Sequence, residues 1–493
     1  MKKFSTKYIA GLLLLMAVFG ASSCKKILEL DPHNTTYTDA YLNNGTDANT
    51  AISGAYSLLR SVLLDNYNYH IYGDAASGAF NIDGGLDNAN FNISNGEFVG
   101  LNVGSSTRNW LNYYKLIQQL NLIIDKVPGM DVAKFSNQDD KKNIIGEAYF
   151  LRAYIYFYMS RVWGDVPLKI KADLDFTQAV NIPRAPAADV LKQCLSDLKV
   201  AEENLVFGYD DEGRRAVRAN LGSAYALEAH IMAWQKDYAG SEKAANLVIT
   251  KGGYSLLDSA SYPKVFIGKS LEGIFEINIS YLQNEGYSLN NGGYAPTLSS
   301  PFVYGRTQLN WPVNPTYIKK IFKDSADVRY KDFFFQAQSN RGQTIKFANI
   351  TYADGSAKSD PRLSNNLIIF RLADIMLLRA EALNHLGRDG EARTMLNAVR
   401  ARAGVPASTE SGEALNLIIL EERLRELYYE GQSFYDLTRV SKLDNPKSHY
   451  FSDYNSHFDD TRINAGGTLW PVDPSLFKDD YEIVQTPYWQ GKL

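Results

Sequence analysis

The sequence predicts a mainly α-helical protein in which paired helices form a scaffold that carries long loops and a few short strands. The clearest observation lies in residues 367–403, where apolar and small side chains recur at a spacing that lines one face of a helix. These side chains are Ile375, Leu378, Ala382 and Leu386. Gly387 and Gly390 interrupt the pattern, and a second helix follows up to Gly404. Two helices joined by so short a turn must pack antiparallel.

A second helical hairpin supports the same fold class. Residues 216–236 and 239–250 again show two helical patterns separated by a short turn. Each hairpin has the form of a tetratricopeptide-type unit, although the full consensus of that repeat is absent. An isolated hairpin within another α-helical fold is the alternative interpretation.

Length and composition narrow the class of protein. A chain of 493 residues is too long for one small core, so two or more subdomains sharing a large core are expected. The net charge is −4 and charged residues make up 22%, which gives no indication of nucleic-acid binding. The chain contains 32 tyrosines, whose apolar rings and polar tips suit contact with sugars or peptides.

The N-terminus predicts export and lipidation. A basic start is followed by an apolar stretch that is too short for a comfortable membrane span. Small residues from Ala21 then lead into Cys24, which resembles a bacterial lipoprotein signal, although that pattern usually has Leu where Ala21 stands. We therefore expect residues 1–23 to be a signal peptide, Cys24 to be lipidated and residues 24–35 to be a tether. An ordinary secretory signal that leaves Cys24 free is the alternative.

The N-terminal part of the mature chain, residues 36–215, is expected to contain four helices and one long loop. Helical spacing of apolar residues places the helices at 47–64, from Trp110 to Ile124, at 141–163 and after Pro186. Residues 65–106 show no 3.6-residue period and are dense in Asn, Asp, Gly, Tyr and Phe. Because the aromatic content argues against disorder, we interpret this segment as a long ordered loop.

The C-terminal part, residues 216–493, combines the helix pairs with mixed structure. Residues 271–280 alternate enough to predict a short strand, and the Gly-, Asn- and Pro-rich residues 281–315 predict a second long loop. A helix is expected from Leu415 to Val440, running past Gly431. Its charged residues predict a solvated or interlocking face rather than acid–base chemistry: Glu421, Glu422, Arg423, Arg425 and Glu426.

Several segments together resemble the SusD/RagB family of outer-membrane lipoproteins. The most specific are EAYFLRAYIYFYMSRVWGDVPL at 147–168 and ILEERLRELYYEGQSFYDLTR at 419–439. Weaker matches are the ILELDP that follows Cys24, a Trp–Tyr–Lys–Ile pattern from Trp110, the LRAEALNHLG hairpin and the late LWPVDP. The resemblance covers nearly all of the mature chain.

This resemblance implies a function as well as a fold. Family members are non-catalytic binding proteins that form a lid over a SusC-like TonB-dependent transporter barrel. They capture glycans, or peptides in the RagB branch, at the cell surface of the outer membrane and pass them to the barrel. The resemblance implies no enzyme activity and no cofactor.

Ligand residues are expected in the two long loops, because loops held by a rigid scaffold carry most binding sites. Aromatic faces receive the C–H faces of sugars, while Asn, Asp and Arg bond the hydroxyl groups. Our candidates are Asp74, Asn81, Asp83 and Phe91 in the first loop and Tyr287, Tyr294, Arg306 and Trp311 in the second. For each of these residues, the alternative to ligand binding is a place in a turn or a packed aromatic ring. Trp311, which precedes Pro312, fits a buried position.

Other candidate sites are weaker. Trp110, Trp163 and Trp234 lie on helical faces and are expected in the core, as is the thiol of Cys194. His449 and His457 lie near aspartates, but their spacing fits no metal-binding pattern, so we expect no metal. A surface glycoside hydrolase would need two carboxylates across a bond, and the sequence alone does not exclude it.

Overall fold

A computed structural model describes residues 42–99, 107–174, 180–208, 211–283, 285, 295–443 and 450–492. Residues 44–493 form one compact unit. No helix within the described ranges is both long enough and apolar enough to cross a membrane. The predicted signal peptide, Cys24 and the tether lie outside the described residues.

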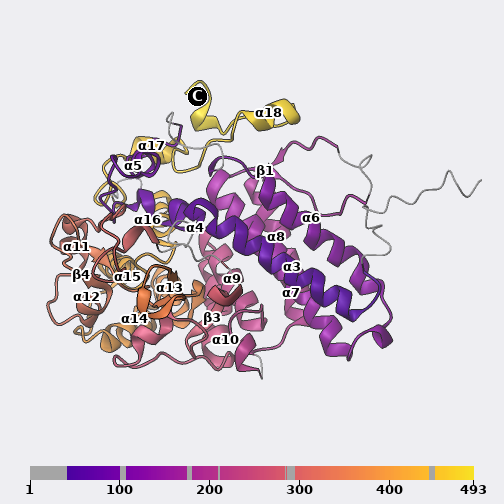
Figure 1. The fold of residues 1–493 in the computed structure, drawn as a ribbon, viewed down its shortest axis with the longest axis horizontal. Helices are drawn as coiled ribbons and strands as arrows, with labels where there is room; N and C mark the ends of the chain where they lie inside the picture. Colours follow the sequence, from indigo (N-terminus) through magenta and orange to yellow (C-terminus); the bar gives the residue numbers. More distant parts are fainter. Residues whose placement is uncertain are drawn as a thin grey trace, which may run out of the picture. The chain divides into compact units, whose positions relative to one another are not determined.

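The expected helices are confirmed in the N-terminal half (Figure 1). They are α3 (Gly45–Leu64), α6 (Leu111–Lys126), α7 (Gln138–Trp163) and α8 (Ala187–Asn204). Helix α3 packs on α6, α6 on α7 and α7 on α8. Helix α7 is buried around most of its circumference, which accounts for the aromatic residues that lie off its predicted apolar stripe. Trp110 and Trp163 lie in this core as expected, and Cys194 on α8 is a buried free thiol.

The paired helices continue the array towards the C-terminus. They are α9 (Leu221–Trp234), α10 (Tyr238–Lys251), α13 (Leu372–His385), α14 (Asp389–Arg402), α15 (Gly412–Glu426) and α16 (Ser433–Leu443). Helix α8 contacts α9, α9 contacts α10, and α10 contacts α13. Helix α13 in turn contacts α14, and α14 contacts α15, as in a tetratricopeptide-like stack. Trp234, at the end of α9, is only half-buried.

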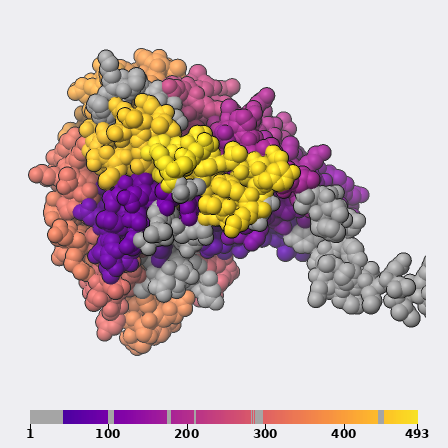
Figure 2. Space-filling model, turned by 90° about the horizontal axis from the view of Figure 1, so that it is seen from above, coloured from indigo at the N-terminus to yellow at the C-terminus, as the bar shows by residue number. Residues whose placement is uncertain are grey.

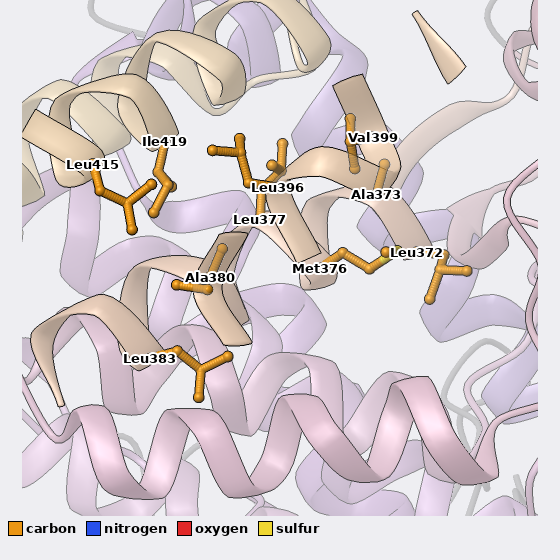
Figure 3. Packing of buried hydrophobic residues seen from close by; sticks show 11 residues of the cluster. Leu372, Ala373, Met376, Leu377, Ala380, Leu383, Leu396, Val399, Leu415 and Ile419 are labelled. Atoms are coloured by element: carbon orange, nitrogen blue, oxygen red, sulfur yellow. The ribbon is translucent and has the colours of Figure 1, made fainter. Parts of the chain in front are cut away.

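One apolar cluster holds the second pair together (Figure 3). Leu377 and Ala380 of α13 face Leu396 of α14 and Leu415 and Ile419 of α15, and all five are fully buried. Burying one such leucine stabilises a fold by about 1.5–3 kcal/mol relative to leaving it exposed. The small side chain of Ala380 lets the helices approach closely.

The strands are few and short, as expected. Strand β3 (Gly273–Ile277) lies within the predicted strand at 271–280 and pairs antiparallel with β8 (Leu367–Arg371). The start of the 367–403 segment is therefore a strand and not a helix, because all five residues of β8 are buried on both faces beside β3. The other pairs are β1 (Val166–Pro167) with β2 (Arg184–Ala185), β4 (Phe334–Phe335) with β5 (Gln343–Thr344), and β6 (Ile350–Tyr352) with β7 (Pro361–Leu363).

Residues 65–106, expected to form one long ordered loop, are ordered in their described part but include short helices that were not expected. That part contains α4 (Asn68–Gly73) and α5 (Asn88–Ser94), each too short to show a helical period in the sequence. All six residues of α4 are buried. The remaining short helices are α11 (Pro315–Ile321), α12 (Val328–Phe333), α17 (Asp460–Asn464) and α18 (Ser475–Asp479).

The expectation of one helix through Gly431 is also wrong. Helix α15 ends at Glu426, and Gly431 has a φ of +70°, a left-handed conformation that interrupts a helix. The reason is a backbone crossing with α4, because a Cβ on Gly73 would lie 2.2 Å from the carbonyl oxygen of Gly431. A continuous helix would leave no room for this contact.

Glycine-to-alanine substitutions test the crossing. Gly73→Ala should destabilise the protein by about 1–3 kcal/mol, because the added methyl group meets backbone that cannot move aside. Gly54→Ala is the matched control, since Gly54 lies on an exposed face of α3 with no atom near its Cβ position. That control should stabilise by about 0.5–1 kcal/mol. Urea unfolding followed by circular dichroism measures both, and equal stabilities would contradict the crossing.

A buried ionic network joins α15 to its neighbours. The Arg371 guanidinium bonds Glu272 at 2.8 Å, Glu426 at 2.7 Å and Glu430 at 2.7 Å, and all four side chains are buried. Arg402 also bonds Glu272 and Glu426. The charged face of α15 therefore interlocks rather than being solvated.

Removal of the central guanidinium should unfold the protein at a markedly lower temperature. Arg371→Ala leaves carboxylates of Glu272, Glu426 and Glu430 buried with fewer partners, and breaking a buried ion pair costs about 3–5 kcal/mol. Arg388→Ala is the control, because Arg388 pairs with Glu391 at the surface and should leave the melting temperature unchanged. Differential scanning calorimetry compares the two variants. A small effect of Arg371→Ala would show that the network relaxes.

Glu276 should give stability a pH dependence near neutrality. Burial raises its pKa from 4.5 to about 7, although Asn366 and the amide of Lys269 donate hydrogen bonds to it. Between these pH values the folded protein holds a proton that the unfolded chain releases, so this contribution to stability is lost as the pH rises towards 7. Glu276→Gln should match the wild type at pH 5 and exceed it in free energy of unfolding at pH 8. Equal pH profiles in urea titrations would contradict this assignment.

Candidate functional site

The two loops proposed for the site lie side by side. Phe80 of the first loop and Val313 of the second form an antiparallel bridge. On either side of it, the amide of Asn81 donates to the carbonyl of Pro312 at 2.9 Å, and the amide of Asn314 donates to the carbonyl of Ala79 at 2.9 Å. Backbone hydrogen bonds therefore fix one loop against the other.

Asp87 is a second connection between the loops. Its carboxylate caps α5 by accepting from the amide of Asn90 at 3.3 Å, and it accepts from the indole N–H of Trp311 at 2.9 Å. Trp311 is fully buried against Phe80 and Tyr429. One acidic side chain thus ends a helix in the first loop and anchors a tryptophan from the second.

Two of the proposed ligand residues are corrected by their burial. Trp311 has no exposed surface with which to contact a ligand, so it is a structural residue. Asp74 is equally buried, and its Oδ2 accepts a hydrogen bond from the amide of Gly431 at 2.8 Å. Nδ1 of His70 lies 2.8 Å from the same carboxylate oxygen. Burial raises the pKa of Asp74, while His70 lowers it. Asp74 therefore positions the backbone crossing and does not face solvent.

The other described candidates reach the surface. Asn81 and Asp83 are exposed, and Phe91 on α5 is 41% exposed. The Phe91 ring packs against Gly84, where a Cβ would lie 3.1 Å from it, so one ring face is supported by backbone. Arg306 is half-buried, and burial lowers the pKa of its guanidinium while Tyr67 raises it. Tyr287 and Tyr294 lie outside the described residues.

Three residues of the site were not identified from the sequence. Tyr67 has a φ of +61°, an uncommon conformation for a non-glycine residue, and its phenol lies near Arg306 and Asp87. Burial raises the pKa of Tyr67, Arg306 lowers it and Asp87 raises it. Tyr304 is 64% exposed in the second loop. Asp87 could have been identified as the cap before the short helical stretch that begins at Asn88, whereas no pattern predicts a left-handed tyrosine.

The surface therefore combines supported aromatic rings with carboxylate, amide and guanidinium groups. In the space-filling view from above, the indigo surface of the N-terminal part borders the salmon and yellow surfaces of later segments (Figure 2). Within the described ranges, no group of three or more His, Cys, Asp or Glu side chains is placed to hold a metal ion. Such a surface suits a neutral, hydroxyl-rich ligand that presents both apolar and polar faces.

Comparison with known proteins identifies the family. The model of the SusD family matches residues 327–489, and a second model, described as starch-binding and associating with the outer membrane, matches residues 63–232. A SusD homologue from Bacteroides thetaiotaomicron has the same fold, with a TM-score of 0.78 and 28% identity over 90% of this chain and 98% of its own. The chain belongs to the SusD/RagB family.

A further relative and a further solved structure match over most of the chain. The SusD-like protein P38 of Formosa agariphila is 27% identical over 90% of this chain and 93% of its own. A laminarin-binding SusD-like protein shares the fold, with a TM-score of 0.73 and 21% identity over 90% of this chain and 100% of its own. Of the two most specific matching segments, 147–168 contains most of α7, and 419–439 contains Glu426 and Glu430 of the ionic network.

Proposed function

We propose that this SusD/RagB protein is a non-catalytic lipoprotein of the cell surface that binds glycans and delivers them to a SusC-like TonB-dependent transporter in the outer membrane. The family assignment supports this role, as does the description of the model matched by residues 63–232 as starch-binding and associating with the outer membrane. Lipidation at Cys24, after removal of residues 1–23, would hold the protein at the membrane, because several acyl chains on one cysteine anchor stably.

The observation that carries the proposal is the pairing of the two loops. Besides the Phe80–Val313 bridge, the amide of Asp83 donates to the carbonyl of Asn310 at 3.0 Å, so Asp83 lies beside the part of the second loop that follows Arg306. Phe91 packs on Gly84, the residue after Asp83, and is exposed. Phe91 can stack on the apolar face of a pyranose, while Asp83 and Arg306 can accept from and donate to its hydroxyl groups. A solved relative is named as laminarin-binding, which supports a glycan for this chain as well.

Loss of the exposed ring should weaken glycan binding. Phe91→Ala removes a stacking surface whose aromatic contact contributes about 0.5–1.5 kcal/mol beyond area burial, so affinity should fall about three- to tenfold. Isothermal titration calorimetry would use the oligosaccharide that wild-type protein binds most tightly on a mixed glycan and peptide array. Tyr481→Ala is the control, since Tyr481 is also an exposed aromatic residue but belongs to neither loop.

Two results would contradict the proposal. If the array identifies only peptides, the ligand class is wrong and peptide capture takes its place. If purified protein releases shorter products from the bound glycan, the protein is a glycoside hydrolase and not a binding protein. Retention of an intact glycan, together with weaker binding by Phe91→Ala, supports capture.

A further inference from the structure

A hollow in the protein surface lies outside the paired loops, beside α12 and the β4–β5 hairpin. It has a volume of about 640 Å³, within the usual range for small-molecule sites. Its wall includes the aromatic rings of Tyr330 and Phe334 and the polar side chains of Gln336, Gln338 and Ser339. None of the six described ligand candidates from the sequence lines it.

The aromatic side of this hollow is held rigidly. Phe334 packs edge-on against Tyr428 at 4.9 Å between ring centroids, and against Phe322 at 5.5 Å. Tyr330 contacts Phe322 at 5.9 Å and is half-buried. The Gln338 amide donates to the Tyr330 hydroxyl at 3.2 Å, so both ends of that ring are fixed. A ligand would meet a ring that is already oriented.

The polar side is a hydrogen-bonded turn. The amide of Ser339 donates to the carbonyl of Gln336 at 2.8 Å, and the amide of Gly342 donates to the carbonyl of Ser339 at 3.1 Å. Gln336 has a φ of +50°, a sparsely populated conformation for glutamine, and its side chain is exposed. Side-chain amides offer both donors and acceptors, and the exposed Lys331 in the same wall adds a further donor, so the wall can donate to and accept from hydroxyl groups.

This turn is connected to the loop site. The Arg341 guanidinium donates to the carbonyl of Thr307 in the second loop at 2.6 Å. Phe335 packs edge-on against Phe302 of the same loop at 5.2 Å. The hollow therefore lies on an element that is fixed to the second loop.

We infer that the hollow lined by Tyr330, Gln336 and Gln338 is a second sugar-binding subsite, which takes a pyranose unit of an oligosaccharide. The inference rests on the proposed glycan-binding function and extends it. The Tyr330 ring receives the C–H face of the sugar, and the two amides bond its hydroxyl groups. Another hollow of about 290 Å³, near α15, is less suited to a sugar, because Lys323, Arg400 and Arg425 in its wall are already paired with Glu421 or Glu422.

The test compares variants of the two glutamines, and Gln336→Ala is also measured alone, because Gln338 holds the Tyr330 ring. Gln336→Ala combined with Gln338→Ala should weaken binding of the tightest glycan from the array about tenfold in calorimetry, because two hydrogen bonds are lost. Gln235→Ala, an exposed glutamine at the end of α9, is the control and should bind like the wild type. A crystal soaked with the same oligosaccharide should show a sugar ring against Tyr330.

The outcomes separate this inference from the proposed function. If wild-type protein binds a glycan, Phe91→Ala weakens that binding and the double amide variant does not, the hollow is not a subsite while the loop site stands. If wild-type protein binds no glycan, both are overturned. Soaked crystals with a sugar only at the loops would also overturn the subsite.

Discussion

The rest of the structure depends on the ionic cluster around Glu426 in α15. Burial opposes ionisation of this side chain, but Arg402, Arg371 and Arg329 hold its pKa well below the usual value, and the Tyr262 hydroxyl donates to it at 2.5 Å. These partners come from α14, β8, α12 and the segment before β3. Taking so many charges out of water costs several kcal/mol per ion, which only close and complete pairing offsets. Any other arrangement of these elements would leave charges buried without partners, which would lower the free energy of unfolding.

This constraint reaches the loops through a short path. Glu430 follows α15 and pairs with Lys346 and Arg371. Gly431 comes next and crosses Gly73 at the end of α4, and Asp74 binds the amide of Gly431. The first loop is thus anchored to the helical scaffold at Gly73 and Asp74, near its start. The second loop is then held to the first by the Phe80–Val313 bridge.

The sequence was sufficient for the long helices but not for the elements of the site. Helices such as α3 and α7 have enough turns for their apolar period to be visible, and the 271–280 strand alternates as a strand should. Helix α4 is six residues long and buried on every side, so no period could reveal it. The residue type also could not separate Asp74 from Asp83, because burial of the former depends on a glycine more than 350 positions away, at Gly431.

The same limit applies to Trp311. A tryptophan in a loop of this composition could either stack on a ligand or pack in the core. Only the position of Asp87, brought close by loop pairing, decides between them. Phe91 could be proposed from the composition of its loop, but composition does not distinguish this exposed ring from Phe80, which is buried. Tyr67 was missed because its left-handed backbone is set by tertiary contacts.

The bond between Asp87 and the Trp311 indole has a consequence for how new specificities arise. Because the Asp87–Trp311 hydrogen bond that joins the loops involves a buried ring, the aromatic and amide side chains on the outer side of the loops can be exchanged without changing the packing beneath them. The residues that keep the shape of the paired loops are thus separate from those that face outward. Chains of this architecture can therefore differ in their outer side chains while the packing beneath stays the same.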